Sequence, residues 1–201
     1  MPLIVDHDER RALIADIVKD MIAETGMDSV TVRAVARKAG YSSTILSHYF
    51  RDKQHLLISA FASVLGEAPM RVAVVMDNGG SLLDCLSELL PINRPNLRDW
   101  QAWFGFWGKV THDPALAEER LVGIEETRKT LHMILEYAIA RKEVPADLNV
   151  AFHANNIQIY LNGLAAMVIT QPDDWPTAAQ QTALKSQILL MKALPGGPTA
   201  D

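Results

Sequence analysis

Apolar residues recur at helical spacing along most of the chain, and residues typical of turns separate the periodic segments. Alternation of the kind that marks strands is weak throughout. The pattern predicts helices over about 8–24, 31–39, 43–50, 52 onward, 81–90, 95 onward, 118–140, 148–170 and 177–194. We therefore expect an all-α protein.

Two short helices joined at a glycine form the most informative part of this pattern. Thr31 stands where an N-cap hydroxyl accepts the free amide of Ala34. Gly40 follows the last periodic residue of the first helix, where a left-handed residue commonly ends a helix, and Ser42 or Ser43 can cap the second one. Such a pair indicates either a DNA-binding helix-turn-helix or a helical hairpin inside a bundle.

The second helix of the pair has an apolar side and a side of short polar groups. Ile45 and Leu46, together with Tyr49 or Phe50, supply the apolar side. The polar side consists of Ser43, Thr44, Ser47 and His48. Side chains of this size can enter the major groove of DNA without filling it, so this is the candidate recognition helix.

The following helix, which begins near Asp52, contains Gly66 and Pro69. Proline removes a backbone donor and clashes with the preceding helical turn. We therefore expect a kink or an early end at Pro69.

Length and composition limit the class of protein. The chain has 201 residues, 49% of them apolar, which is enough for one domain or two small ones. It contains no apolar run of 18 residues, and Asp6, Asp8 and Glu9 stand near its start, so we expect neither a membrane span nor a signal peptide.

The single Cys85 excludes an intramolecular disulfide and a multi-cysteine zinc site, as suits a cytoplasmic protein. Histidine and acidic residues show no metal-ligand spacing, so we expect no metal and no cofactor.

Charge is distributed unevenly along the chain, whose net charge is −5. Residues 1–56 hold eight basic and eight acidic residues, whereas the remainder holds eleven basic and sixteen acidic residues. Five basic residues surround the predicted helix pair: Arg33, Arg37, Lys38, Arg51 and Lys53. A basic face for DNA phosphates can therefore exist on an acidic protein.

The helix pair and its flanks resemble the DNA-binding domain of TetR-type transcriptional repressors. The similarity covers roughly residues 10–60 and is carried by the stretch AETGMDSVTVRAVARKAGYSSTILSHYFRDKQHLL. Tyr41 departs from the valine that usually follows the turn glycine, and is either a packing variant or a residue whose hydroxyl reaches a phosphate. The resemblance implies a three-helix helix-turn-helix domain over residues 1–53, followed by a helical effector-binding and dimerisation domain over residues 54–201.

The same resemblance assigns roles in DNA binding to individual residues. It implies base contacts by Ser43, Thr44 and Ile45, and Ser47 counts as a further DNA-binding residue. It makes Arg33 the reader of a guanine through its O6 and N7 atoms. Phosphate contacts are implied for Thr31, Ser42, His48, Tyr49 and Lys53. The alternatives are that Thr31 is only a cap, that Tyr49 is partly core and that Arg33 contacts a phosphate.

Further along the chain, four aromatic residues share one helical face: Trp100, Trp103, Phe104 and Trp107. They are either ordinary core or the wall of an effector cavity, in which indole faces attract a cation or stack on a flat apolar ligand. Gly105 and Gly108 each cost this helix about 1 kcal/mol relative to alanine, which indicates close approach of another group to the backbone.

This aromatic region resembles the subgroup of TetR repressors that includes the choline-responsive regulators of glycine-betaine synthesis. The similarity rests on Trp103, Phe106 and Trp107, followed by the turn His112-Asp113-Pro114. It implies a choline-like or other small cationic effector, and the alternative is the broad apolar or aromatic ligand of an efflux-type regulator. Further candidates for effector contacts are Tyr137, Asn156 and Tyr160.

The last two predicted helices, 148–170 and 177–194, carry apolar faces wider than an intramolecular core requires. In the resembled family this pair forms a four-helix bundle with its mate, which implies a homodimer here. Two recognition helices related by a dyad can read two half-sites of a double-stranded DNA operator. An effector then needs only to disturb their spacing.

Two other classes of function have to be weighed against a ligand-responsive, dimeric repressor. The chain has no GxSxG, P-loop, GxGxxG or HExxH motif, and its cysteine has no identifiable neighbouring base, so we do not expect an enzyme. A helical protein-interaction module without DNA binding is the remaining alternative.

Overall fold

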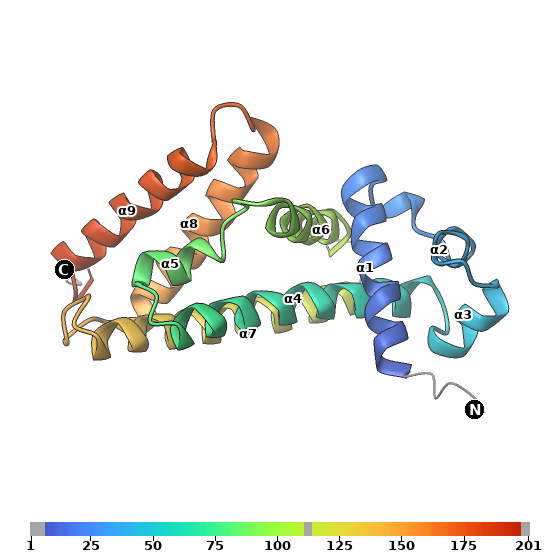
Figure 1. Cartoon of the computed structure of the whole chain (residues 1–201), viewed down its shortest axis with the longest axis horizontal. Helices are drawn as coiled ribbons and strands as arrows, with labels where there is room; N and C mark the ends of the chain where they lie inside the picture. Colours follow the sequence, from blue (N-terminus) through green and yellow to red (C-terminus); the bar gives the residue numbers. More distant parts are fainter. Residues whose placement is uncertain (1–6, 111–113, 198–201) are drawn as a thin grey trace. The chain divides into compact units, whose positions relative to one another are not determined.

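The computed structural model of the protein describes residues 7–110 and 114–197, and these residues form helices without a strand among them. The expected all-α class is confirmed (Figure 1). The elements in chain order are α1 (His7–Thr25), the short 3-10 helix η1 (Met27–Ser29), α2 (Val32–Ala39), α3 (Ser43–Tyr49), α4 (Lys53–Asp77), α5 (Leu82–Ser87), α6 (Arg94–Val110), α7 (Pro114–Ala140), α8 (Val150–Thr170) and α9 (Thr177–Ala193). His112 and Asp113 of the expected turn lie outside the described residues.

Packing divides the chain into two compact units. The first unit consists of residues 1–66 and 98–123, and the second consists of residues 67–97 and 124–201. Helices α4, α6 and α7 therefore contribute residues to both units. This division follows packing, so the functional boundary expected after residue 53 stays a prediction.

The predicted helix pair is present in the first unit as α2 and α3, with the expected residues at its ends (Figure 1). The hydroxyl oxygen of Thr31 accepts the amide of Ala34 at 3.1 Å. Gly40 has a φ of 72° and ends α2 in the left-handed conformation. Of the two serines that can cap α3, Ser42 does so, because its hydroxyl oxygen accepts the amide of Ile45 at 3.2 Å. Interactions within a few residues thus fix the turn that orients α3.

We expect Gly40→Ala to destabilise the protein by about 1 kcal/mol, because a Cβ disfavours the left-handed conformation by roughly that amount. Gly66→Ala is the matched control. Gly66 lies inside α4, and a Cβ there would meet no atom within 4 Å, so alanine should stabilise the helix by about 0.5 to 1 kcal/mol. Urea unfolding measures both changes, and two changes of the same sign would contradict this account of the turn.

One apolar core joins α1, the helix pair, α6 and the first part of α4 within the first unit. Leu46 within α3 and Phe50 at its end pack into this core, since they are 0% and 1% exposed. The opposite side of α3 is left to solvent. Other buried members of the core are Ile14, Val18, Val35, Phe61, Trp103 and Phe106.

Helix α6 lies close to α1 at a glycine. A Cβ at Gly105 would come within 2.7 Å of Cγ2 of Ile22, so the absence of a side chain permits the approach. The close approach expected at this position is confirmed. The same expectation for Gly108 is wrong, because a Cβ there would meet nothing within 4 Å.

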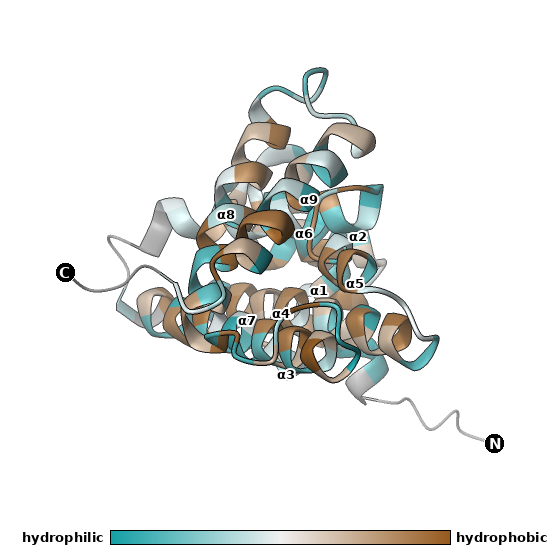
Figure 2. Ribbon diagram, turned by 90° about the vertical axis from the view of Figure 1, so that its left-hand side faces the viewer, coloured by the Kyte–Doolittle hydropathy of each residue, from teal (hydrophilic) through white to brown (hydrophobic). Residues whose placement is uncertain are grey.

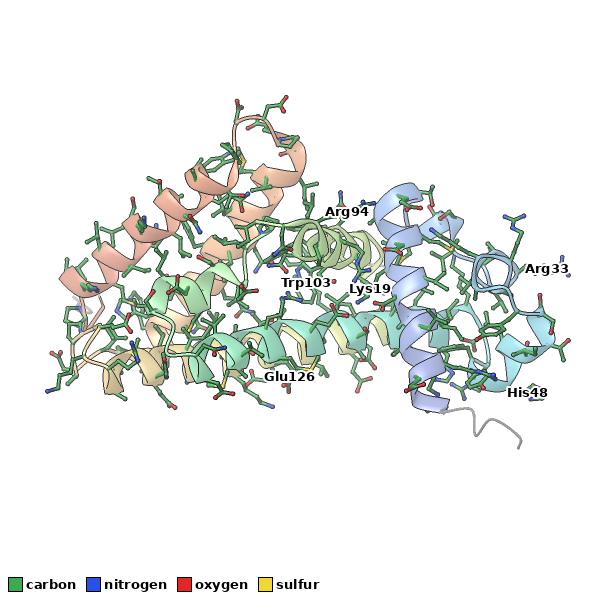
Figure 3. All side chains as sticks on the ribbon, in the orientation of Figure 1. Lys19, Arg33, His48, Arg94, Trp103 and Glu126 are labelled. Carbon is green, nitrogen blue, oxygen red and sulfur yellow. The ribbon has the colours of Figure 1, made fainter. Side chains whose placement is uncertain are left out.

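Charged residues also join α1 to α6. Nζ of the fully buried Lys19 lies 2.8 Å from a carboxylate oxygen of Asp16 and 3.8 Å from one of Asp99. Figure 3 shows Lys19 between the two helices. Arg98 donates to Asp20 at 3.2 Å. Burial opposes the charge of Arg98, but the hydrogen bond to Asp20 and the neighbouring carboxylates raise its pKa. Helix α6 is thereby held against α1 by charge as well as by apolar contact.

Helix α4 continues through Pro69 over its full 25 residues, so the expected early end is wrong. An interior proline costs about 3 kcal/mol. Apolar burial on both sides of Pro69, at Phe61 and Val72 for example, offsets this cost.

Among the helices of the described ranges, α4 alone is long and apolar enough to cross a membrane by length and composition. Glu67 and Arg71 interrupt its apolar sequence.

The second unit contains α5, α8 and α9 together with parts of α4, α6 and α7. Helices α8 and α9 lie side by side, and α5 contacts α9. Figure 2 shows hydrophobic bands on α8 and α9 and a hydrophilic loop between them. Helix α5 is shorter than the predicted 81–90, because the amides of Leu89 and Leu90 bond carbonyls three residues back in tight turns.

Candidate DNA-binding surface and effector region

The polar side of α3 faces solvent. Ile45 is 39% exposed, and Arg33 on α2 is exposed as well. Figure 3 shows Arg33 and His48 on the side of the helix pair that faces away from α1. The structure therefore brings the expected base-contacting residues to the outer surface of the pair. The exposed polar residues of α3 are Ser43, Thr44, Ser47 and His48.

Positive charge surrounds this surface. Arg33 and Arg37 lie one helical turn apart on α2, and Arg51 follows α3. In the part of the chain that the structure describes, these three arginines form no ion pair with a carboxylate, whereas Lys38 pairs with Glu24 at 3.0 Å. Arginines without an internal partner are available to DNA phosphates.

Several of the expected phosphate-contacting residues already make hydrogen bonds. Thr31 and Ser42 accept backbone amides as helix caps. Each hydroxyl keeps its own hydrogen and can still donate it to a phosphate oxygen, so the cap and phosphate alternatives are compatible. Lys53 donates to the carbonyl of Met27 at 3.3 Å, which leaves two of its three ammonium hydrogens. The hydroxyl of Ser47 donates at 2.9 Å to the carbonyl one turn earlier in α3.

Tyr49 is only 8% exposed, which supports the alternative that it is core. Arg10 of α1 donates to its hydroxyl oxygen at 3.1 Å, and this hydrogen bond raises the pKa of Arg10. The same guanidinium lies 5.6 Å from the centre of the Tyr41 ring, which packs against the core as a packing variant should. The sequence pattern did not single out Arg10, because it lies 39 residues from Tyr49.

The aromatic stripe of α6 forms a series of ring contacts in the first unit. Ring centres lie 5.7 Å apart for Trp100 and Phe104, 5.5 Å for Phe104 and Trp107, and 6.1 Å for Trp107 and Trp103. Trp103 is 7% exposed and stacks on Phe61 of α4 at 5.2 Å. The other three rings are half-buried. Trp103 is therefore core, whereas the rest of the stripe keeps accessible surface.

Arg120 of α7 is a partner of this stripe that the sequence pattern did not single out. Its Cζ lies 4.6 Å from the centre of the Trp107 ring, the geometry of a cation–π pair. The protein's own cation therefore occupies the indole face where a ligand cation was expected. A signal was present in the sequence, because Arg120 lies one helical turn from the buried Leu116 and so on the side of α7 that faces the core.

The other three effector candidates belong to the second unit. The hydroxyl of Tyr137 bonds the carbonyls of Met76 and Gly80, at 3.2 and 3.1 Å, and so closes the turn after α4. Asn156 is exposed and bonds a carbonyl of its own helix. Tyr160 is half-buried, and burial raises its pKa. These contacts give Tyr137 a structural role, and the effector roles of all three stay predictions.

The described residues offer neither a metal site nor an activated cysteine. Within those ranges no cluster of three or more His, Cys, Asp or Glu side chains is arranged to hold a metal ion. Cys85 is buried, and burial raises the pKa of its thiol. A raised pKa disfavours the thiolate that a nucleophilic cysteine requires.

Two family models match this sequence. The model described as bacterial regulatory proteins of the tetR family matches residues 19–60, which include α2 and α3. The model described as the C-terminal part of BetI-type transcriptional repressors matches residues 80–191, more than half of the chain. The second match includes the aromatic stripe, Arg120, α8 and most of α9.

Individual proteins show the same similarity. The HTH-type transcriptional regulator PksA of Bacillus subtilis (strain 168) is 27% identical over 176 residues, which cover 86% of this chain and 84% of PksA. The regulator BetI of Escherichia coli (strain K12) is 30% identical over 155 residues, which cover 73% of this chain and 76% of BetI. A regulator from Saccharomonospora viridis, solved in complex with choline, matches 90% of this chain and 96% of its own with a TM-score of 0.76 and 19% identity. At that identity the structural match shows the fold.

Proposed function

This chain belongs to the TetR family of bacterial transcriptional regulators and carries a BetI-type C-terminal domain, and on that premise we propose that it is a homodimeric repressor which leaves its DNA operator when a small molecule binds. Proteins of this family are DNA-binding regulators and not enzymes, which removes the enzyme alternative. The helix-turn-helix match removes the alternative of a module without DNA binding. We place the protein in the cytoplasm, where its operator DNA lies.

One observation carries the DNA-binding part of this proposal. Helix α3 is fixed to the core on one side and presents short polar side chains to solvent on the other. We assign base contacts to Ser43, Thr44 and Ile45, the last through a thymine methyl group, and a guanine contact to Arg33. Phosphate contacts then fall to the hydroxyls and cations at the ends of α2, α3 and α4, among them Lys53.

We propose that α8 and α9 form the homodimer interface. Both helices expose large apolar side chains within the described chain: Ile159 is 71% exposed, Met167 41%, Leu189 66% and Leu190 55%. Apolar surface of this kind on consecutive helices is typical of an interface. A two-fold axis through it would present two copies of α3 to the two half-sites of an operator.

For the effector we propose a small organic molecule that binds beside the aromatic stripe of α6. Choline is the first compound to test, because the similar Saccharomonospora viridis regulator was solved with choline. An apolar or aromatic ligand is the alternative, and it would stack on the half-buried rings of Trp100 and Phe104. A difference in affinity of about 1 to 3 kcal/mol between the two states of the dimer is enough to weaken operator binding 5- to 150-fold, roughly.

Arg33→Ala and Lys53→Ala test the assignment of base and phosphate contacts. We expect Arg33→Ala to weaken operator binding by about 1 to 3 kcal/mol per half-site and to leave binding to unrelated DNA nearly unchanged. Lys53→Ala should weaken binding to both DNAs alike and reduce the salt slope by about 1 per subunit. Competition binding to the DNA upstream of its own gene, at two salt concentrations, measures both effects.

Lys38→Ala is the control for this experiment, since Lys38 is a nearby cation already paired with Glu24. It should change operator binding and the salt slope little. Identical behaviour of Arg33→Ala and Lys53→Ala would refute the separate assignments. Lack of sequence-selective binding by the unaltered protein would refute the proposed function itself.

A further inference from the structure

Arg120 is a charge on the core-facing side of α7. Leu116 precedes it by one turn and is 5% exposed, and Gly123 follows it by nearly one turn and is buried. Residues at this spacing lie on one helical face. Arg120 is itself half-buried, and its guanidinium lies over the Trp107 indole ring.

The Trp107–Arg120 pair contains two buried hydrogen-bond donors that have no acceptor among the residues the structure describes. One is Nε1 of the Trp107 indole and the other is Nε of the Arg120 guanidinium. The two groups are neighbours, with Cζ of Arg120 lying 4.6 Å from the indole ring centre. Among the residues that the structure describes, no carboxylate forms an ion pair with Arg120, whereas Arg98 of the same unit has carboxylates of Asp16, Asp20 and Asp99 around it.

The two donors lack the same kind of partner, a hydrogen-bond acceptor. Indole N–H and guanidinium N–H groups donate and cannot accept, so only an acceptor satisfies them. A buried donor without an acceptor is unfavourable, and a partly buried cation without a counterion is more so. The cation–π contact compensates the guanidinium only in part, because it supplies no hydrogen-bond acceptor.

We propose that Trp107 and Arg120 form the anion-recognising part of the effector site, and that the effector is a small organic molecule bearing a carboxylate. Its carboxylate accepts from Arg120 Nε and Trp107 Nε1, and its apolar body lies on the half-buried rings of the stripe. This inference rests on the proposed ligand response and names the group that the ligand carries. A bare cation is disfavoured here, because it would have to displace Arg120 from the Trp107 face against like-charge repulsion.

Four small probes of similar shape separate the effect of a carboxylate from the effect of a cation. Glycine betaine carries both groups, choline carries the cation and a hydroxyl, 3,3-dimethylbutyrate carries only the carboxylate, and 3,3-dimethylbutanol carries neither charge. Calorimetric titration of the intact protein with each probe gives four affinities. We expect each acid to bind about 10- to 100-fold more tightly than the alcohol of matching shape, as charge-assisted hydrogen bonds to arginine permit.

Variants at the two donors identify the source of this preference. Arg120→Met keeps a long apolar side chain on the core-facing side of α7 and should bring acids and alcohols to nearly equal affinity. Trp107→Phe keeps an aromatic ring without the N–H. It should reduce the preference for acids several-fold. If the two donors share the carboxylate, roughly half of the logarithm of the acid-to-alcohol affinity ratio is lost. Arg128→Met is the control on the same helix, since Arg128 already pairs with Glu125 at 2.7 Å.

The possible results divide clearly. A preference for the acids that disappears in Arg120→Met and persists in Arg128→Met supports the site. Equal affinity of acids and alcohols in the unaltered protein overturns it, and so does the absence of binding by all four probes. Tighter binding of choline and glycine betaine in Arg120→Met also overturns it, because Arg120 would then only block a cation site. A gel shift with operator DNA is run separately: an acid that binds without releasing DNA supports the site and contradicts the proposed regulation.

Discussion

Leu189→Glu in α9 is expected to make the protein monomeric and to reduce its affinity for operator DNA by at least about a thousandfold, the lower end of the usual gap between specific and non-specific binding. Leu189 is 66% exposed in the single chain and lies beside Leu190, which is 55% exposed. In a two-fold interface the glutamate would meet the same apolar surface of the partner. A carboxylate buried there without a counterion is strongly unfavourable.

Sedimentation equilibrium and operator binding measure the two expected changes. Val74→Glu is the control, because Val74 of α4 is 60% exposed but lies outside α8 and α9. It introduces the same charge on an exposed apolar residue and should leave the dimer intact. If Leu189→Glu remains dimeric and Val74→Glu does not, the interface lies on another surface of the protein.

The helix-turn-helix is the part of the fold that the sequence predicted most completely. Thr31, Gly40 and Ser42 act through hydrogen bonds and backbone angles that involve residues at most four positions away. Local interactions of this kind do not depend on the rest of the fold. The bounds of α2 and α3 were therefore predictable to within one residue.

Helix α1 shows where an apolar pattern is insufficient. Hydropathy alone would bury the apolar Leu13 and expose the charged Lys19, yet Leu13 is 48% exposed and Lys19 is fully buried. Lysine is almost never fully buried unless a partner compensates its charge. One of those carboxylates, Asp99, comes from α6, and a pattern read along a single helix contains no information on it.

The contacts of the candidate effector region could not be predicted from the sequence, for the same physical reason. Helical spacing placed Trp103 and Trp107 on one face correctly, since that depends on one helix. Which ring is core and which face is covered depends on Phe61 of α4 and Arg120 of α7. These contacts arise between elements distant in the sequence, so only the folded structure reveals them.

Asp99→Ala is expected to lower the free energy of unfolding by about 3 kcal/mol, because Lys19 would stay buried in α1 without its carboxylate from α6. Asp16 lies closer, at 2.8 Å, but compensates only in part, because its side chain is 48% exposed and therefore screened by solvent. Urea unfolding measures the change. In the control Asp20→Ala, the lost carboxylate is 40% exposed, so the cost should be about 1 kcal/mol or less.

The double variant Lys19→Met, Asp99→Leu separates the effect of charge from the effect of packing. Replacing both members of a buried ion pair by apolar residues of similar volume is often neutral or stabilising. The double variant should therefore regain most of the stability that Asp99→Ala loses. A loss that persists in the double variant would mean that the shape of the Asp99 side chain, and not its charge, holds α6 against α1. If charge holds the two helices together, Asp99→Ala should also loosen the contact between α1 and α6, the helix that carries the aromatic stripe.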